Sequence, residues 1–264
     1  MIEVIANEYQ QEELVALLDE YSAAGFEQTG EKLIAYFGED NFAHKDVLKT
    51  LGGYAYQISA VKEQNWNTVW EQNFYPVVVN DFCAIRAHFH QPITTVEHEI
   101  IITPKMSFGT GHHATTYMMM EQMRNIDFKN KNVFDFGTGT GILAILAHKL
   151  GAAKVSAIDL DEWSISNARE NFERNDCSQI NIELSNRPPS QQFDIILANI
   201  NRNVILHYMS GLRKALKPQG QLLLSGLLIA DETDIVAKSS SYNLQFQNKW
   251  KRDGWISLLF ASPE

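Results

Sequence analysis

Three glycines at alternating positions form the segment whose spacing most directly indicates chemistry. Residues 133–136 are apolar apart from one acid, Gly137, Gly139 and Gly141 follow, and an apolar stretch begins at Ile142. A strand that turns sharply into a helix through glycines lets a ligand approach the backbone, and the helix N-terminus offers it free amide groups. The segment therefore predicts a nucleoside-binding turn between a strand and a helix.

An acid at the end of the next candidate strand strengthens this prediction. Residues 155–159 form a short strand pattern that ends in Asp159, 20 residues after Gly139, where a carboxylate would accept hydrogen bonds from ribose hydroxyls. The dinucleotide pattern Gly-x-Gly-x-x-Gly would place its last glycine one residue beyond Gly141. Asp135 would also repel a pyrophosphate, whereas it suits a ligand that carries an amine or a positive charge.

A third polar residue ends another apolar strand pattern. Residues 193–199 end in Asn199, and ligands of open α/β sheets gather at the carboxyl ends of the strands. Downstream, residues 216–221 are expected to form a turn before a strand at 222–224. Residues 244–250 and 255–261 flank Asp253-Gly254, which indicates an antiparallel hairpin.

The glycine spacing, with an acid two residues before it, resembles that of S-adenosylmethionine-dependent methyltransferases of the Rossmann-like class. This resemblance implies an α/β fold with a mostly parallel seven-stranded sheet and a terminal antiparallel hairpin. It also implies S-adenosylmethionine as the methyl donor and S-adenosylhomocysteine as the product, without a metal.

A second motif narrows the resemblance to one family. Residues 107–116 read Ser-Phe-Gly-Thr-Gly-His-His-Ala-Thr-Thr and resemble the Ala-Phe-Gly-Thr-Gly-Thr-His-Pro-Thr-Thr segment of the PrmA family, the methyltransferases of large-subunit ribosomal protein eleven. Trp70, Phe74 and Pro76 also match that family, whereas His112 and Ala114 depart from it. The resemblance implies a cytoplasmic enzyme that methylates lysine side chains and the α-amino group of that ribosomal protein.

The resemblance also implies which residues contact the cofactor: Thr116, Gly137, Asp159 and Asn199. Asn199 is the expected catalytic residue, because its amide can position the acceptor amine, and no dedicated general base is expected. The Thr116 hydroxyl could alternatively cap a helix, and Asn199 could be a turn residue. His112 and His113 could bind a metal or move a proton, but no third ligand is suggested nearby, so we expect no metal site.

Charge and element order indicate a separate N-terminal domain. Residues 1–60 contain eleven acids and three bases, so they carry −8 of the net charge of −10. Their pattern predicts the order β-α-β-β-α-β of a ferredoxin-like arrangement. We therefore expect a small α+β ferredoxin-like substrate-recognition domain at 1–61, a helical linker at 62–76 and the methyltransferase domain at 77–264.

Composition excludes several other classes of protein. A net charge of −10 over 264 residues is poorly suited to a phosphate backbone, so we expect no direct nucleic-acid binding. Cys83 and Cys177 lie in no metal-ligand or disulfide pattern, which favours a reducing, cytoplasmic location. No apolar run approaches about 18 residues and no signal peptide is recognisable, so we expect no contact with a membrane.

Three alternatives stay open. The chain could be a methyltransferase that acts on another protein or on a small amine. From different classes, it could be a nicotinamide-dependent oxidoreductase or a non-catalytic module that binds S-adenosylmethionine.

Overall fold

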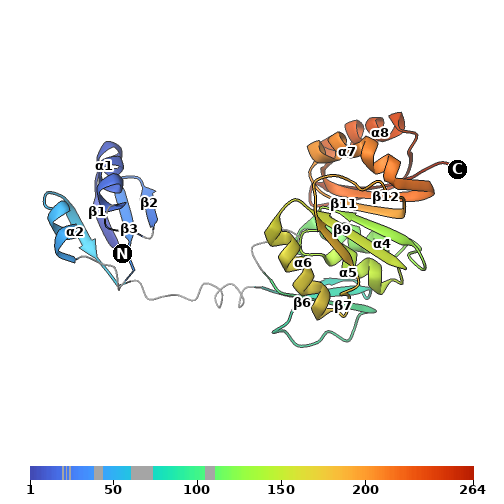
Figure 1. Cartoon of the computed structure of the whole chain (residues 1–264), viewed down its shortest axis with the longest axis horizontal. Coiled ribbons are helices and arrows are strands. Elements are labelled where there is room, and N and C mark those ends of the chain that lie inside the picture. The colour runs from blue at the N-terminus through green and yellow to red at the C-terminus, as the bar shows by residue number, and fades with distance from the viewer. Residues whose placement is uncertain (20, 22, 24, 39–43, 61–73, 105–110) are drawn as a thin grey trace. The chain divides into compact units, whose positions relative to one another are not determined.

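The structure is a computed structural model that describes residues 1–19, 21, 23, 25–38, 44–60, 74–104 and 111–264. The chain divides into two compact units, Met1–Trp70 and Glu71–Glu264. Most of the helical linker expected at 62–76, including Trp66 and Trp70, lies outside the described residues. Its described end, residues 74–76, is not helical (Figure 1).

The N-terminal unit consists of a four-stranded sheet and two helices. Its elements are β1 (Ile2–Ile5), α1 (Glu8–Asp19), β2 (Gly25–Thr29), β3 (Lys32–Tyr36), α2 (His44–Thr50) and β4 (Ala55–Ile58). The strand order is β2-β3-β1-β4, and every neighbouring pair is antiparallel. This is the β-α-β-β-α-β element order that the sequence predicts.

The core of this unit lies between one face of the sheet and both helices. Ile2 and Val4 of β1 point to the same face, because successive residues of a strand point to opposite faces. They pack in one apolar cluster with the helix residues Leu14, Leu18 and Val47. The unit therefore has an apolar core of its own.

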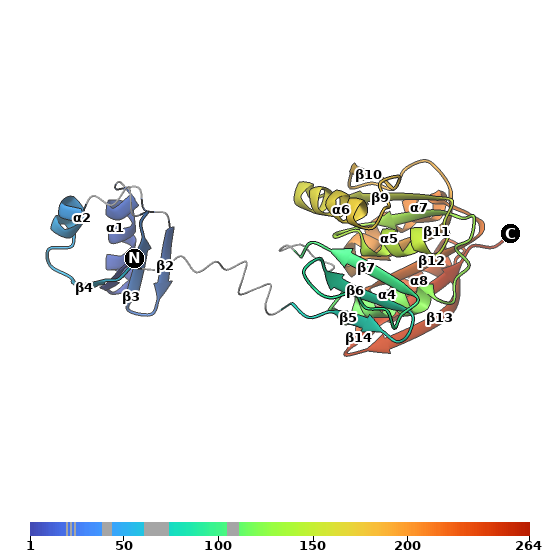
Figure 2. The same cartoon turned by 90° about the horizontal axis from the view of Figure 1, so that it is seen from below.

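The second unit is built on a seven-stranded sheet in the order β10-β9-β8-β11-β12-β14-β13. Its strands are β8 (Asn132–Phe136), β9 (Lys154–Asp159), β10 (Asn181–Leu184), β11 (Phe193–Asn199), β12 (Leu216–Leu228), β13 (Gln245–Arg252) and β14 (Trp255–Ala261). The first five strands in this order pair in parallel, and β14 and β13 follow as an antiparallel hairpin (Figure 2). The mostly parallel sheet with a terminal antiparallel hairpin is confirmed.

Helices cover both faces of this sheet and bury two apolar clusters (Figure 1). The helices on one face are α4 (Ala114–Met123), α5 (Ile142–Lys149) and α6 (Glu162–Arg174), and those on the other are α7 (Arg202–Ala215) and α8 (Glu232–Ser241), with a 3₁₀ turn η2 (Ile229–Asp231) before α8. Met119, Met120 and Met123 of α4 are buried in the first cluster. Within the described part of the chain, no helix has both the length and the apolar character to cross a membrane.

The turn predicted at residues 216–221 is present as an irregularity within β12. Leu216 follows α7 directly, is fully buried and pairs with Phe193 of β11, but the pairing resumes only at Gln221 with Ile195. Between these two pairs Gln219 has a φ of 59°, as in a turn whose preceding residue is proline. The local turn prediction is confirmed, and Leu216 adds one paired residue before the turn.

A small additional sheet precedes the main one in the chain. It contains β5 (Val77–Val79), β6 (Cys83–Ala87) and β7 (His98–Ile102), and β7 lies against α5 and α6 (Figure 2). Arg86 of β6 donates two hydrogen bonds to the carboxylate of Glu99, from Nε at 2.8 Å and from a terminal nitrogen at 3.0 Å. The Glu99 carboxylate also accepts the Ile93 amide at 2.6 Å.

We expect Glu99→Ala to lower the free energy of unfolding by about 2–4 kcal/mol, because it leaves the nearly buried Arg86 guanidinium without its partner. Glu97→Ala is the matched control. Glu97 pairs with Arg124 at 2.7 Å, but both side chains are substantially exposed, so its loss should change stability little. Urea denaturation of the two variants measures the difference, and equal effects would contradict a structural role for the Arg86–Glu99 pair.

Candidate active site

The three glycines form a tight turn between β8 and α5, and two of them have no room for a side chain. Gly137, Gly139 and Gly141 all have positive φ, at 75°, 54° and 82°. A Cβ at Gly137 would lie 2.4 Å from Cγ2 of Ile200, and one at Gly141 would lie 2.5 Å from Cε1 of Phe172. The turn therefore requires glycine for conformation and for space.

Asp159 at the end of β9 holds this turn in place. One oxygen of its carboxylate, Oδ2, accepts a hydrogen bond from the Gly139 amide at 2.8 Å, and Oδ1 accepts one from the Asp161 amide at 3.1 Å. The amides of Gly137 and Thr138 both donate to the Ile158 carbonyl at 3.0 Å. Asp159 is half-buried, so its carboxylate both organises the turn and stays partly accessible to a ligand.

Asp135 is a buried acid directly beneath the turn. Its Oδ2 accepts a hydrogen bond from the Thr138 hydroxyl at 2.6 Å, whereas no hydrogen bond of good geometry reaches Oδ1. Burial raises the pKa of Asp135 to about 7, the charge of Asp159 adds to this, and the Thr138 hydroxyl and the Ala144 amide offset part of it. One oxygen of this carboxylate is therefore buried beneath the turn without a hydrogen bond of good geometry.

Asn199 at the end of β11 meets Thr116 of α4, although 83 positions separate them in the chain. The Asn199 side-chain nitrogen donates to the Thr116 hydroxyl at 3.1 Å. Thr116 is buried and Asn199 is half-buried. The helix cap that the sequence left open for Thr116 is supplied by His113, whose ring accepts from the Thr115 amide.

Gly226 is a site residue to which the sequence reasoning assigned no role. It has a φ of 80° in an irregular part of β12, and a Cβ there would lie 2.3 Å from the carbonyl oxygen of Ile200. The neighbouring Ser225 carbonyl accepts the Ile200 amide at 3.2 Å. Since Ile200 follows Asn199, this close backbone approach fixes the end of β11.

The predicted residues thus lie in two groups at the carboxyl ends of neighbouring strands. Gly137 and Asp159 belong to the turn, Thr116 and Asn199 form the second group, and Ile200, which fills the space beside Gly137, connects the two. β9 and β11 flank β8 in the sheet, so the strand ends at Asp159 and Asn199 are about 10 Å apart at a strand spacing of about 4.8 Å. Residues 107–110 of the second motif lie outside the described residues.

The two histidines have structural contacts. His112 Nε2 lies 2.8 Å from the Tyr75 carbonyl oxygen, and its ring meets that of Phe74 edge-on. The His113 ring lies edge-on to Trp255 at 4.6 Å between centroids. Among the residues that the structure describes, no three His, Cys, Asp or Glu side chains are grouped as a metal site.

The sheet, the terminal hairpin and the glycine turn define a class I methyltransferase of the Rossmann-like type. The family model described as "Ribosomal protein L11 methyltransferase (PrmA)" matches residues 2–263. The chain belongs to this family.

Individual relatives agree with this assignment. The ribosomal protein L11 methyltransferase of Porphyromonas gingivalis is 39% identical over 259 residues, covering 94% of this chain and 89% of that protein. The enzyme of the same name from Phocaeicola vulgatus is 38% identical over 209 residues, which are 78% of this chain and 74% of that protein. The crystal structure of ribosomal protein L11 methylase from Lactobacillus delbrueckii subsp. bulgaricus superposes with a TM-score of 0.68 at 29% identity, covering 72% of this chain and all of that one.

The raised pKa of Asp135 predicts how stability depends on pH. The ordinary pKa of 3.8 rises to about 7 on folding, so the free energy of unfolding should fall as the pH rises from about 4 to about 7. Asp135→Asn removes this titration. We expect the ligand-free variant to gain stability relative to the parent protein between pH 5 and pH 8. The gain should be about 1.4 kcal/mol for each pH unit below the folded-state pKa of about 7.

Asp194→Asn is the control of opposite sign. Burial alone would raise the pKa of Asp194, but the Asn132 amide and the Lys217 ammonium outweigh it and hold that pKa below its usual value. Its loss should therefore destabilise the protein about equally at pH 5 and pH 8. Urea denaturation of both variants at pH 5 and pH 8 measures these changes in the free energy of unfolding. An Asp135→Asn effect independent of pH would contradict the raised pKa of Asp135.

Proposed function

We propose that this chain transfers methyl groups from S-adenosylmethionine to lysine side-chain and α-amino nitrogens of ribosomal protein L11, in the cytoplasm. The relatives named above are named as methyltransferases or methylases of ribosomal protein L11. The observation that supports the proposal is the contact of Asn199 with Thr116 at the strand end beside the glycine turn. A polar amide at this strand end suits an acceptor amine next to a bound nucleoside.

The residues of the turn fit S-adenosylmethionine. The glycines of the turn carry no side chain between the backbone and a ligand, and the partly accessible Asp159 carboxylate has lone pairs left for ribose hydroxyls. The unpartnered Oδ1 of Asp135 suits the positive charge of a ligand that carries an ammonium group and a sulfonium. When bound, this cofactor supplies an electrophilic methyl group and a neutral leaving group, and it leaves as S-adenosylhomocysteine.

Asn199 is the residue that would position the acceptor. Because its side-chain nitrogen donates to Thr116, its carbonyl oxygen is the atom left to accept a hydrogen bond from an amine. A lysine with a pKa near 10.4 is neutral in only about one molecule in 2,500 at pH 7. Partial desolvation of the site favours the neutral amine over the ammonium ion, and an amide oxygen opposes this effect less than a charged carboxylate would. Orientation of the amine then supplies much of the rate enhancement.

The acidic N-terminal unit is proposed to recognise the protein substrate. Residues 1–60 carry a net charge of −8, whereas the rest of the chain is nearly neutral. An acidic surface attracts a lysine-bearing ribosomal protein and mainly accelerates its association. This recognition role, with domain limits near 61 and 77, is independent of the residues that bind the cofactor.

Incubation of the protein with L11 and S-adenosylmethionine, followed by intact-mass spectrometry of L11, tests the proposal. We expect mass increases of about 14 Da per methyl group. Asn199→Ala should slow turnover by about 10–100-fold, because the amine nitrogen gains positive charge in the transition state and a hydrogen bond to a charged group is worth about 1.5–3 kcal/mol. Asn203→Ala, at an exposed position on α7, is the control and should retain full activity. An L11 mass that stays unchanged with the parent protein would disprove the proposal.

Removal of the N-terminal unit should separate cofactor binding from recognition. A chain that starts at Glu71 keeps both apolar clusters of the second unit, so it should bind S-adenosylmethionine almost normally. It should methylate L11 with a KM raised at least tenfold, and the full-length chain should lose this advantage as salt rises, because exposed charges are screened beyond about 8 Å at physiological salt. Equal KM values for the two chains would show that the acidic unit is not the recognition domain.

A further inference from the structure

A large aromatic side chain on the second unit has no role in the fold. Trp163, in the first turn of α6, is 78% exposed, although tryptophan is among the most thoroughly buried side chains on average. Leu160 and Leu184 are 72% and 51% exposed. Isolated exposed apolar residues need no explanation, but a group of them indicates an interaction site.

These three residues, which we call the Trp163 patch, lie together at one end of the sheet. Leu184 is paired with Asp159 in the β9–β10 register, and the Ser185 amide donates to the Asp159 carbonyl at 2.8 Å. Leu160 follows Asp159 directly. The Trp163 amide donates to Asp161, the N-cap of α6, so the first turn of the helix begins right beside this strand end.

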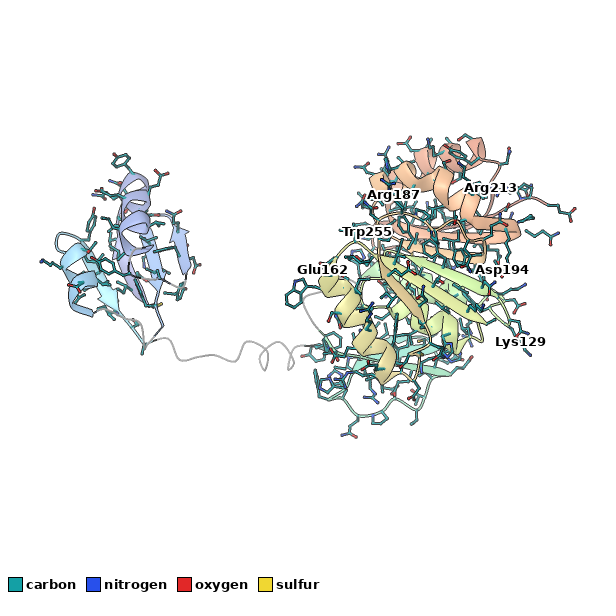
Figure 3. All side chains as sticks on the ribbon, in the orientation of Figure 1. Lys129, Glu162, Arg187, Asp194, Arg213 and Trp255 are labelled. Atoms are coloured by element: carbon teal, nitrogen blue, oxygen red, sulfur yellow. The ribbon has the colours of Figure 1, made fainter. Side chains whose placement is uncertain are left out.

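A shallow groove of about 470 Å³ continues from the patch along α6. Its lining includes Ile165 and Leu184 as apolar residues, with Glu162 and Glu173 at either end. Figure 3 shows Glu162 at the surface, at the start of α6. Among the described lining residues the one basic side chain is Arg169, so the groove has an apolar floor and a predominantly acidic rim.

We infer that the Trp163 patch and this groove dock a basic, partly apolar segment of the methyl-accepting protein, next to the lysine that is methylated. The inference rests on the proposed function. A ribosomal protein contacts RNA phosphates and therefore carries the basic side chains that match the acidic rim. The patch begins directly after Asp159, about 10 Å across the strands from Asn199, and Leu184 on β10 lies one strand further, about 14 Å away, a distance that about four residues of extended chain span. Trp163 is the anchor, since tryptophan is enriched among residues that dominate interface energetics.

Trp163→Ala tests this in the full-length protein, with L11 as the substrate and saturating S-adenosylmethionine. We expect the KM for L11 to rise at least tenfold, with the cofactor affinity and the melting temperature retained, because the side chain contributes little to the core. Phe246→Ala is the matched control, since Phe246 is also exposed, at 43%, but lies on β13 at the opposite edge of the sheet. The KM of the Phe246→Ala variant for L11 should stay unchanged. Glu162→Lys combined with Glu173→Lys should also raise the KM, and should reduce its dependence on salt.

The other outcomes overturn the inference. An unchanged KM in Trp163→Ala would show that L11 does not use the patch. Weaker binding of S-adenosylmethionine would assign Trp163 to the cofactor site, and a dimer of the parent protein that Trp163→Ala dissociates would assign the patch to a second copy of the chain. If the parent protein leaves L11 unmodified, the proposed function itself fails and this docking role fails with it.

Discussion

The hydrogen bond between the Gly139 amide and the Asp159 carboxylate is the interaction on which the site depends. It joins the turn after β8 to the end of β9. The three residues with positive φ in this turn are glycines, so none of them has a side chain that would block a ligand. Burial, and to a lesser extent the charge of Asp159, raises the pKa of Asp135 beneath the turn, so the turn combines a partly accessible acid with a buried one. A cationic nucleoside can balance both charges, whereas a pyrophosphate would add to them.

The second half of the site depends on how closely β12 approaches β11. Gly226 lets its backbone come within van der Waals distance of Ile200, and the Ile200 side chain in turn occupies the space beside Gly137. Asn199 is therefore held between the glycine turn and α4, where Thr116 fixes the direction of its amide. We propose that the methyl donor and the acceptor amine meet at these strand ends.

Local patterns were sufficient to predict the glycine turn, the strand ends at Asp159 and Asn199, and the terminal hairpin, because each depends on residues that are close in the sequence. The hairpin turn at Asp253 and Gly254 has positive φ at both residues, as such a dipeptide predicts. Long-range features could not be derived in this way. The spacing of residues does not show that Thr116 meets Asn199, that Gly226 needs to be glycine, or that Leu216 pairs with Phe193 of β11 before the turn. The expected linker helix and residues 107–110 lie outside the described residues and stay predictions.

The central claim is that the turn with Asp159 binds the nucleoside of a sulfonium donor and not a dinucleotide. Isothermal titration calorimetry of the purified full-length protein with S-adenosylmethionine, and separately with NAD, tests it most directly. The account predicts saturable binding of one S-adenosylmethionine per chain and no binding of NAD over the same concentration range. Binding of NAD without binding of S-adenosylmethionine would contradict it and would favour an oxidoreductase.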